Sequence, residues 1–336
     1  MLKIGYGPQH EQYQPLPLLD YAVEAERAGF DSIWTSDHFH PWAHTNAASA
    51  FAWVWMAALA ERTKRVEIGT SVTCPILRYN PAIVAQAFAT LRAMYPDRIF
   101  LGLGTGEAMN EVPVGYQWPP FKERAERLEE AINVMKLLWS GSFVDYEGKY
   151  FKLCKANLYT KPSSPPAIFV AASGPTVAEI AGKHADGFLT TNRIADQPQY
   201  RSILLPALDR GAKSAGRDPG EIIKALEIGM AYDEDYEKAL RAARFWAGTL
   251  LPASFKYGTA DPREIEEHGL TVGDKEIAQA WSVGTKPEDY IKQLERYVKM
   301  GFQHVYVVSS SPDQIKALKM YGRHVLPYIR STCGKT

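Results

Sequence analysis

The chain has 336 residues, and a chain of this length buries roughly three quarters of its unfolded surface, which suits one large α/β barrel or two ordinary domains. Lys plus Arg and Asp plus Glu are equal at 38 each. Because the formal net charge is zero, nothing in the overall charge attracts the chain to nucleic acid or to an anionic membrane, and we expect neither as a partner.

The first segment, residues 1–6, is strand-like and has neither a basic region nor a long apolar core. No apolar run reaches the roughly 18 residues that a membrane span needs. We therefore expect a cytoplasmic protein. The three cysteines, Cys74, Cys154 and Cys333, include no CxxC pair, so they predict neither a disulfide framework nor a zinc knuckle.

Short apolar runs alternate with longer amphipathic segments along the chain, a pattern typical of a parallel sheet covered by helices. The predicted strands are 2–6, 32–36, 66–73, 99–104, 167–172, 187–191, 225–232 and 304–309. Each is followed by a helical pattern. Eight strand and helix units in a chain of this length favour a (β/α)8 TIM barrel over a doubly wound sheet.

The clearest helices are predicted over 121–139 and 290–298, where apolar residues recur every three or four positions. Gly301 is expected to end the second of them as a C-cap.

One barrel domain is expected over 1–330, followed by a tail over 331–336. Two stretches exceed the repeat, at about 141–166 and 251–281, and are predicted to be insertions over the C-terminal face of the barrel. The first contains Tyr146-Glu147-Gly148-Lys149-Tyr150, a sequence that predicts a small hairpin.

In barrels of this kind the active site lies at the C-terminal ends of the strands. Here those ends carry mostly small polar residues, at 71–74, 105–107, 173–174, 190–191 and 309–310. The most informative one is Ser36–Trp42, SDHFHPW, which follows a buried strand with charged and aromatic residues. The alternative interpretation is that Asp37 caps the next helix while the histidines and Trp42 only pack.

His38 and Glu107 suit proton transfer, because histidine titrates near neutral pH and a glutamate under aromatic cover can be raised toward it. The alternative for Glu107 is an ordinary carboxylate at a helix N-terminus. His38, His40 and His44 match no standard zinc spacing, so we expect no metal.

Two glycine-containing strand ends could receive a ligand. Gly102, Gly104 and Gly106 would let a flat ligand approach the backbone, although the run is not GxGxxG and predicts no nicotinamide site. The segment 173–176 leads into a helix whose N–H groups could hold a phosphate. Either segment could also be a plain turn.

Four collinear blocks, SDHFHPW at 36–42, RYNPAIVAQ at 78–86, GTGEAMNE at 104–111 and FWA at 245–247, resemble the deazaflavin-dependent dehydrogenases of the luciferase-like barrel family. The resemblance covers nearly the whole chain. It implies coenzyme F420 as the cofactor, a small-molecule substrate and a homodimer. Its two nearest branches are the F420-dependent secondary alcohol dehydrogenases and the F420-dependent glucose-6-phosphate dehydrogenases.

The resemblance also implies site residues. His38, Trp42 and Glu107 match the catalytic positions, with His38 taking the hydroxyl proton and Glu107 handling the proton at the reduced ring; which is acid and which is base stays open. A non-prolyl cis peptide is implied at Ser71–Val72. The residues placed against the deazaflavin are Asp37, Ser71, Val72, Cys74, Thr105, Gly106, Asn110, Ser173, Gly174, Thr176 and Val177. Cys74 stands where the sugar-phosphate enzymes have threonine, so it contributes backbone or packing.

The substrate is where the two branches differ. The sugar-phosphate enzymes hold the phosphate with a threonine, two lysines and an arginine; Thr191 and Lys256 are kept, but Ala280 stands at the arginine position and Ile194 or Arg193 at one lysine. Losing a guanidinium removes about 1.5 to 3 kcal/mol of phosphate binding.

The pocket of the alcohol enzymes has a cysteine where this chain has Thr249. We expect a secondary alcohol dehydrogenase whose substrate site includes Thr191, Arg193, Thr249 and Lys256. The first alternative is a glucose-6-phosphate dehydrogenase, since Arg193 with Lys256 could still bind a phosphate. The second is a carrier or sensor that binds the deazaflavin without turnover.

Overall fold

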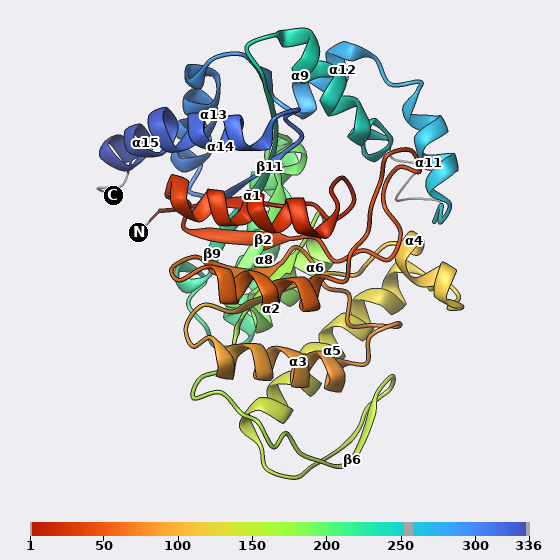
Figure 1. Cartoon of the computed structure of the whole chain (residues 1–336). Helices are drawn as coiled ribbons and strands as arrows, with labels where there is room; N and C mark the ends of the chain where they lie inside the picture. Colours follow the sequence, from red (N-terminus) through yellow and green to blue (C-terminus); the bar gives the residue numbers. More distant parts are fainter. Residues whose placement is uncertain (1, 252–257, 334–336) are drawn as a thin grey trace.

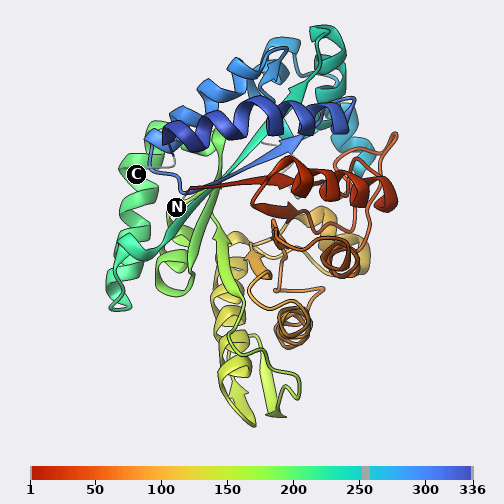
Figure 2. The ribbon, with the colours of Figure 1, turned by 60° about the vertical axis from the view of Figure 1, so that its left-hand side comes forward.

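The computed structural model describes residues 2–251 and 258–333, within which eight parallel strands surround a common axis and helices cover them (Figure 1 and Figure 2). The barrel strands are β1 (Lys3–Gly7), β2 (Ser32–Thr35), β3 (Glu67–Thr70), β4 (Phe100–Leu103), β7 (Ala167–Ala171), β8 (Gly187–Thr191), β9 (Ile223–Tyr232) and β11 (His304–Ser309). They follow the order β3, β2, β1, β11, β9, β8, β7, β4. Bridges from Ile68 to Ile99 and from Thr73 to Leu103 bring β3 against β4 and nearly close the ring. The predicted (β/α)8 barrel is therefore confirmed.

The strand predictions are right in number and place but not at every boundary. Four strands end earlier than predicted: β3 stops at Thr70 rather than at 73, and β2, β4 and β7 each stop one residue early. β9 starts two residues earlier than predicted, at Ile223. A short strand, β10 (Val283–Gly284), pairs with the end of β9 and was not predicted.

Helices lie around the strands (Figure 1). They are α1 (Pro15–Ala28), α2 (Ala52–Arg62), α3 (Pro81–Met94), α5 (Phe121–Ser140), α6 (Pro175–His184), α8 (Leu205–Ser214), α9 (Tyr236–Ala243), α13 (Pro287–Lys299), α14 (Gln314–Met320) and α15 (Leu326–Cys333). The chain also has short π-helices, η2 (Tyr200–Leu204) and η5 (Tyr321–Val325), and short 3-10 helices, η3 (Pro219–Glu221) and η4 (Arg244–Leu250). Gly301 has φ +95 and follows the end of α13, as expected of a C-cap glycine. None of the helices described is both long enough and apolar enough to span a membrane.

The barrel interior is aromatic. Trp34 and Tyr306 stack with ring centroids 4.8 Å apart, and the rings of Phe100 and Phe169 contact Trp34 from the other strands. Gly69 makes room for Phe100, since a Cβ there would lie 2.2 Å from the ring. This packed aromatic layer closes the lower barrel, so ligands must bind above it.

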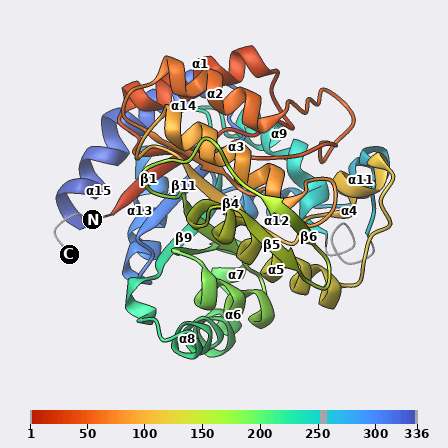
Figure 3. The same cartoon turned by 90° about the horizontal axis from the view of Figure 1, so that it is seen from below.

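The predicted hairpin is present: β5 (Val144–Glu147) pairs antiparallel with β6 (Lys152–Ala156), and Figure 3 shows both beside α5. It does not lie over the C-terminal face as predicted, because it connects α5 to the start of β7 and the backbone N–H groups of Tyr150 and Phe151 donate to Glu130 on α5. The second expected insertion contains α11 (Pro262–Gly269), at the right-hand edge of Figure 1, and α12 (Asp274–Ala280), near its top. Lys256 lies outside the described residues. The division into one domain over 1–330 and a tail over 331–336 stays a prediction.

Candidate active site

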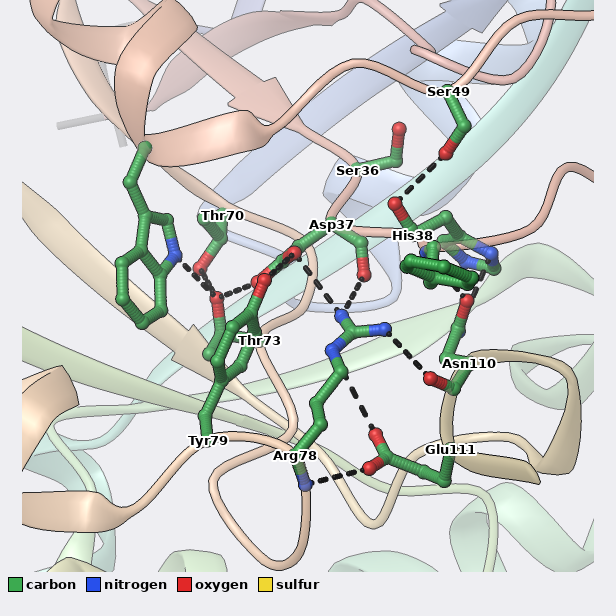
Figure 4. A network of polar contacts seen from close by, with 12 residues as sticks. Ser36, Asp37, His38, Ser49, Thr70, Thr73, Arg78, Tyr79, Asn110 and Glu111 are labelled. Carbon is green, nitrogen blue, oxygen red and sulfur yellow. Dashed lines mark hydrogen bonds and ion pairs between the residues drawn. The ribbon is translucent and has the colours of Figure 1, made fainter. Parts of the chain in front are cut away.

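Three segments meet at the C-terminal ends of the barrel strands β1, β2 and β4. Residues 8–14 follow β1, the SDHFHPW segment follows β2, and 104–107 follow β4 and lead into α4 (Ala108–Glu111). Because the strands are parallel, their ends share one face of the barrel. Side chains far apart in the chain therefore come into contact there, and Figure 4 shows part of this network.

The side-chain amide of Asn110 links His38 to Glu107. Its Nδ2 donates to Oε2 of Glu107 at 3.2 Å and lies 3.3 Å from Nδ1 of His38, while its Oδ1 accepts from the backbone N–H of Phe39 at 2.8 Å. Trp42 is buried, with its ring centroid 5.5 Å from that of His38. The three predicted catalytic residues and Asn110 thus form one cluster. Glu107 occupies the N-cap position of α4 but makes no side-chain cap bond, so helix capping does not account for it.

The ring of His38 has partners for two protonation states. When Nδ1 is bare it accepts from Asn110, and when Nδ1 is protonated it donates to the carbonyl of His40, 3.1 Å away. In both states an N–H at Nε2 faces Oε1 of Glu11, 3.4 Å away. His38 can therefore gain or lose a proton without leaving its place.

Glu11 is a site residue that the sequence reasoning missed. Its side chain is completely buried, and Oε2 accepts from the hydroxyl of Ser36 at 2.5 Å. The neighbouring His10 is also fully buried, and neither of its ring nitrogens has a hydrogen-bond partner within residues 2–251 and 258–333. Burial lowers the pKa of His10 to about 3, so this ring is neutral. Applied to the first strand, the strand-end rule would have pointed to these residues.

Asp37 is buried among protein donors. Its Oδ2 accepts from Thr73 at 2.6 Å, and its Oδ1 accepts from Arg78 and Tyr79 at 3.1 Å each (Figure 4). The next helix, α2, begins at Ala52, so Asp37 does not cap it, and that alternative interpretation was wrong. Its carboxylate instead joins the ends of β2 and β3.

The predicted ring-facing segments come together where β3 and β4 end. The peptide bond between Ser71 and Val72 is cis, as the resemblance implied. Gly106 has φ +72, and a Cβ there would lie 2.4 Å from Sγ of Cys74, so these two segments touch. Cys74 is buried, and burial raises the pKa of its thiol well above the usual value, which leaves it a packing residue. Thr105, the residue before Gly106, is half-buried.

A further carboxyl group, also missed by sequence reasoning, lies inside the barrel. Glu227 on β9 is in register with Tyr306 on β11, and the tyrosine hydroxyl donates to Oε2 of Glu227 at 2.6 Å. The same hydroxyl is 2.5 Å from Oγ of Ser71. Burial raises the pKa of Glu227, and the charges of Glu11 and Glu107 add to that shift. A glutamate in the middle of a strand gives no motif by which to find it.

The N-terminus of α6 has the open space and the backbone N–H groups that an anion-binding site needs. Gly174 is the N-cap; a Cβ there would meet nothing within 4 Å, and no acidic side chain occupies the first turn. Ser173 and Thr176 are exposed beside it, and Val177 is buried. The unpaired N–H groups of such a turn favour a phosphate.

The predicted substrate residues are brought together only in part. Thr191 ends β8, and Arg193 follows in α7 (Asn192–Ala195). The guanidinium of Arg193 donates to the backbone carbonyls of Thr249 at 2.7 Å and Leu250 at 3.0 Å. The guanidinium therefore caps the end of η4, and at least two of its N–H donors are used there.

The chain was compared with known proteins. The family model described as luciferase-like monooxygenase matches residues 2–304. The F420-dependent glucose-6-phosphate dehydrogenases of Intrasporangium calvum and Segniliparus rotundus are 44% and 43% identical over 98% of this chain, and 99% and 98% of their own chains are covered. The chain belongs to the luciferase-like family. A solved F420-dependent secondary alcohol dehydrogenase, in complex with an F420-acetone adduct, superposes with a TM-score of 0.93 at 44% identity, covering 98% of this chain and 99% of its own.

Membership of the luciferase-like family agrees with the resemblance of the four sequence blocks. Among the described residues, no group of histidine, cysteine, aspartate and glutamate side chains has an arrangement that could hold a metal ion. The described residues that meet at this face are buried carboxyl groups and imidazoles, and the N-terminus of α6 is open.

Proposed function

We propose that this protein is a coenzyme F420-dependent dehydrogenase that oxidises the CH–OH group of a small molecule. The observation that carries the proposal is the Asn110 bridge, which holds His38 and Glu107 in one cluster at the barrel mouth. Relatives 43% to 44% identical over nearly the whole chain are named F420-dependent dehydrogenases, which supports the cofactor and the reaction class.

The residues present fit the coenzyme. The open N-terminus of α6 at Gly174 suits its phosphate, and the glycine at 106 lets a flat ring approach the backbone. Bound there, a deazaflavin supplies a two-electron hydride acceptor. Ser71, Val72, Thr105 and Asn110 border the same region, whereas the carboxylate oxygens of Asp37 already have protein donors.

His38 takes the hydroxyl proton of the substrate as the C–H bond is broken. The buried carboxylate of Glu11 faces Nε2 and stabilises the imidazolium that forms, and the His40 carbonyl receives the N–H at Nδ1. A protonated Glu107 would supply the proton that the coenzyme ring takes up with the hydride, while the hydroxyl proton stays on His38. Asn110 keeps both groups oriented while Trp42 covers the imidazole and excludes water.

For the substrate we propose a secondary alcohol. Arg193 donates to two backbone carbonyls of η4, and Ala280 stands where the sugar-phosphate enzymes are expected to have arginine. Stripping water from a phosphate dianion needs charged partners in return. The glucose-6-phosphate dehydrogenases among the relatives support the sugar phosphate at least as well, and Thr191 and Lys256 are kept in this chain.

The test compares kcat/KM for isopropanol and for glucose 6-phosphate on the unmodified protein. Turnover is measured as the loss of F420 absorbance. We expect isopropanol to be used at least as efficiently. A clear preference for glucose 6-phosphate that is lost in Lys256→Ala would establish the sugar-phosphate branch. Binding of F420 without bleaching by either substrate would favour the carrier or sensor. A homodimer and a cytoplasmic location stay predictions.

A further inference from the structure

Arg78 lies between the two segments that carry the proposed acid and base. Its Nη2 donates to the backbone carbonyl of Asp37 at 2.9 Å and to Oδ1 of the same residue at 3.1 Å. Its Nη1 donates to the backbone carbonyl of Asn110 at 3.3 Å. One guanidinium therefore bonds the residue directly before His38 and the residue whose amide joins His38 to Glu107 (Figure 4).

A second contact ties Arg78 to the same short helix. Its backbone N–H donates to Oε2 of Glu111 at 2.8 Å, and its Nε lies 3.8 Å from Oε1. The helix α4 has only four residues, so its own hydrogen bonds cannot keep it in place. The contacts to Arg78 anchor it from outside.

The arginine is a rigid and permanently charged anchor. Its side chain is only 8% exposed, and the planar fork reaches partners on two sides at once. The charged or titratable groups that act on its pKa are Asp37, Tyr79, Glu111 and Cys74, and the two carboxylates with Tyr79 keep it cationic despite burial. A lysine would keep the charge but offer a single ammonium to partners that lie apart.

We propose that Arg78 is a positioning residue that sets the separation and orientation of His38 and Glu107. The inference rests on the proposed function, because it assigns a role in that reaction. It does not make Arg78 a catalytic residue: its Nη1 and Nη2 bond Asn110 and Asp37, and the reacting groups are held through them. Misplacing a reacting group by about 1 Å lowers turnover by roughly 100-fold.

The experiment compares Arg78→Lys with the control Arg98→Lys. Arg98 is also a partly buried arginine that donates to backbone carbonyls, those of Ala60, Thr63 and Val66, but it lies at the other end of the strands. We expect Arg78→Lys to lower kcat by about 10-fold to 100-fold with KM within about 3-fold, and Arg98→Lys to leave kcat within about 2-fold. Both are assayed at the same folded fraction.

A second readout needs neither coenzyme nor substrate. The imidazole nitrogens of His38 are followed by NMR across a pH titration of the free protein, since their shifts report which nitrogen carries the proton. In Arg78→Lys we expect these shifts to move as Asn110 loses its place, and in Arg98→Lys we expect them unchanged. If Arg78→Lys does not fold, Glu111→Gln replaces it, because it weakens only the anchor to α4, and a smaller effect of the same direction is expected.

Wild-type kcat together with unmoved His38 resonances in Arg78→Lys would overturn the inference. Equal effects in the two lysine variants would also overturn it, by showing a general loss of stability. A wild-type protein that reduces F420 with neither substrate contradicts the proposed function, whereas the resonances of His38 still report whether Arg78 positions it.

Discussion

Oε1 of Glu11 lies 3.4 Å from Nε2 of His38, and the side chain of Glu11 is completely buried. A buried carboxylate beside an imidazole is placed to attract positive charge that forms on the ring during a reaction, because water is excluded there. This pairing joins the segment after β1 to the segment after β2. It assigns Glu11 a part in the proton transfer that we propose for His38.

Glu11→Gln keeps the shape of the side chain and removes the charge. We expect kcat to fall by about 10-fold to 100-fold, because the imidazolium loses its partner, while F420 affinity changes little. Steady-state kinetics and a binding titration measure the two quantities. The half-buried Glu266, which accepts from the backbone of His44, is the matched control as Glu266→Gln. Unchanged kcat in Glu11→Gln would remove it from the mechanism.

His38→Ala and Glu107→Gln are each expected to lower turnover by roughly 100-fold or more, the usual scale of general acid and base catalysis. Coenzyme affinity should change much less, as measured by fluorescence titration. His44→Ala serves as the control, since His44 is exposed on the same segment. Near wild-type turnover in either variant excludes that residue as acid or base.

Glu111 makes the stability of the protein depend on pH near neutrality. Burial raises its pKa to about 7 from an ordinary value of 4.5. The folded chain therefore binds this proton more tightly than the unfolded chain, and stability falls as pH rises from about 4.5 to about 7. The difference in free energy of unfolding between Glu111→Gln and the wild type should be about 2 to 3 kcal/mol more favourable to the variant at pH 8 than at pH 5. Urea unfolding at the two pH values measures this difference. A pH-independent difference would contradict the shift.

His10 has the opposite dependence. Burial lowers its pKa to about 3 from 6.5, so the unfolded chain binds the proton more tightly and stability is lost as pH falls below about 6.5. The fall in the free energy of unfolding between pH 7 and pH 5 should be about 2 kcal/mol smaller in His10→Leu than in the wild type. Urea unfolding at the two pH values checks it. His304, whose pKa is lowered by burial in the same way, remains and keeps part of the acid sensitivity in the variant. An equally steep loss in His10→Leu would show that the ring is not buried neutral.

The sequence by itself determined the barrel and the face on which the site lies. Eight apolar runs separated by amphipathic helices leave few folds open, and residues such as His38 and Glu107 stand where strands end. The resemblance in four blocks pointed to the coenzyme and to the cis bond at Ser71–Val72. These features are local or follow from the strand and helix period, so a linear pattern carries them.

Only the tertiary structure decided which side chains touch. Glu11 is 27 residues from His38 and Arg78 is 32 from Asn110, and neither pairing has a local signal. Glu227 and Tyr306 meet because β9 and β11 are neighbours in one register. Such contacts depend on how the strand ends are arranged around the barrel, and burial then sets the pKa values. The hydrogen bonds from Arg193 to the carbonyls of η4 likewise follow from the packing of α7 against η4, for which the sequence has no local signal.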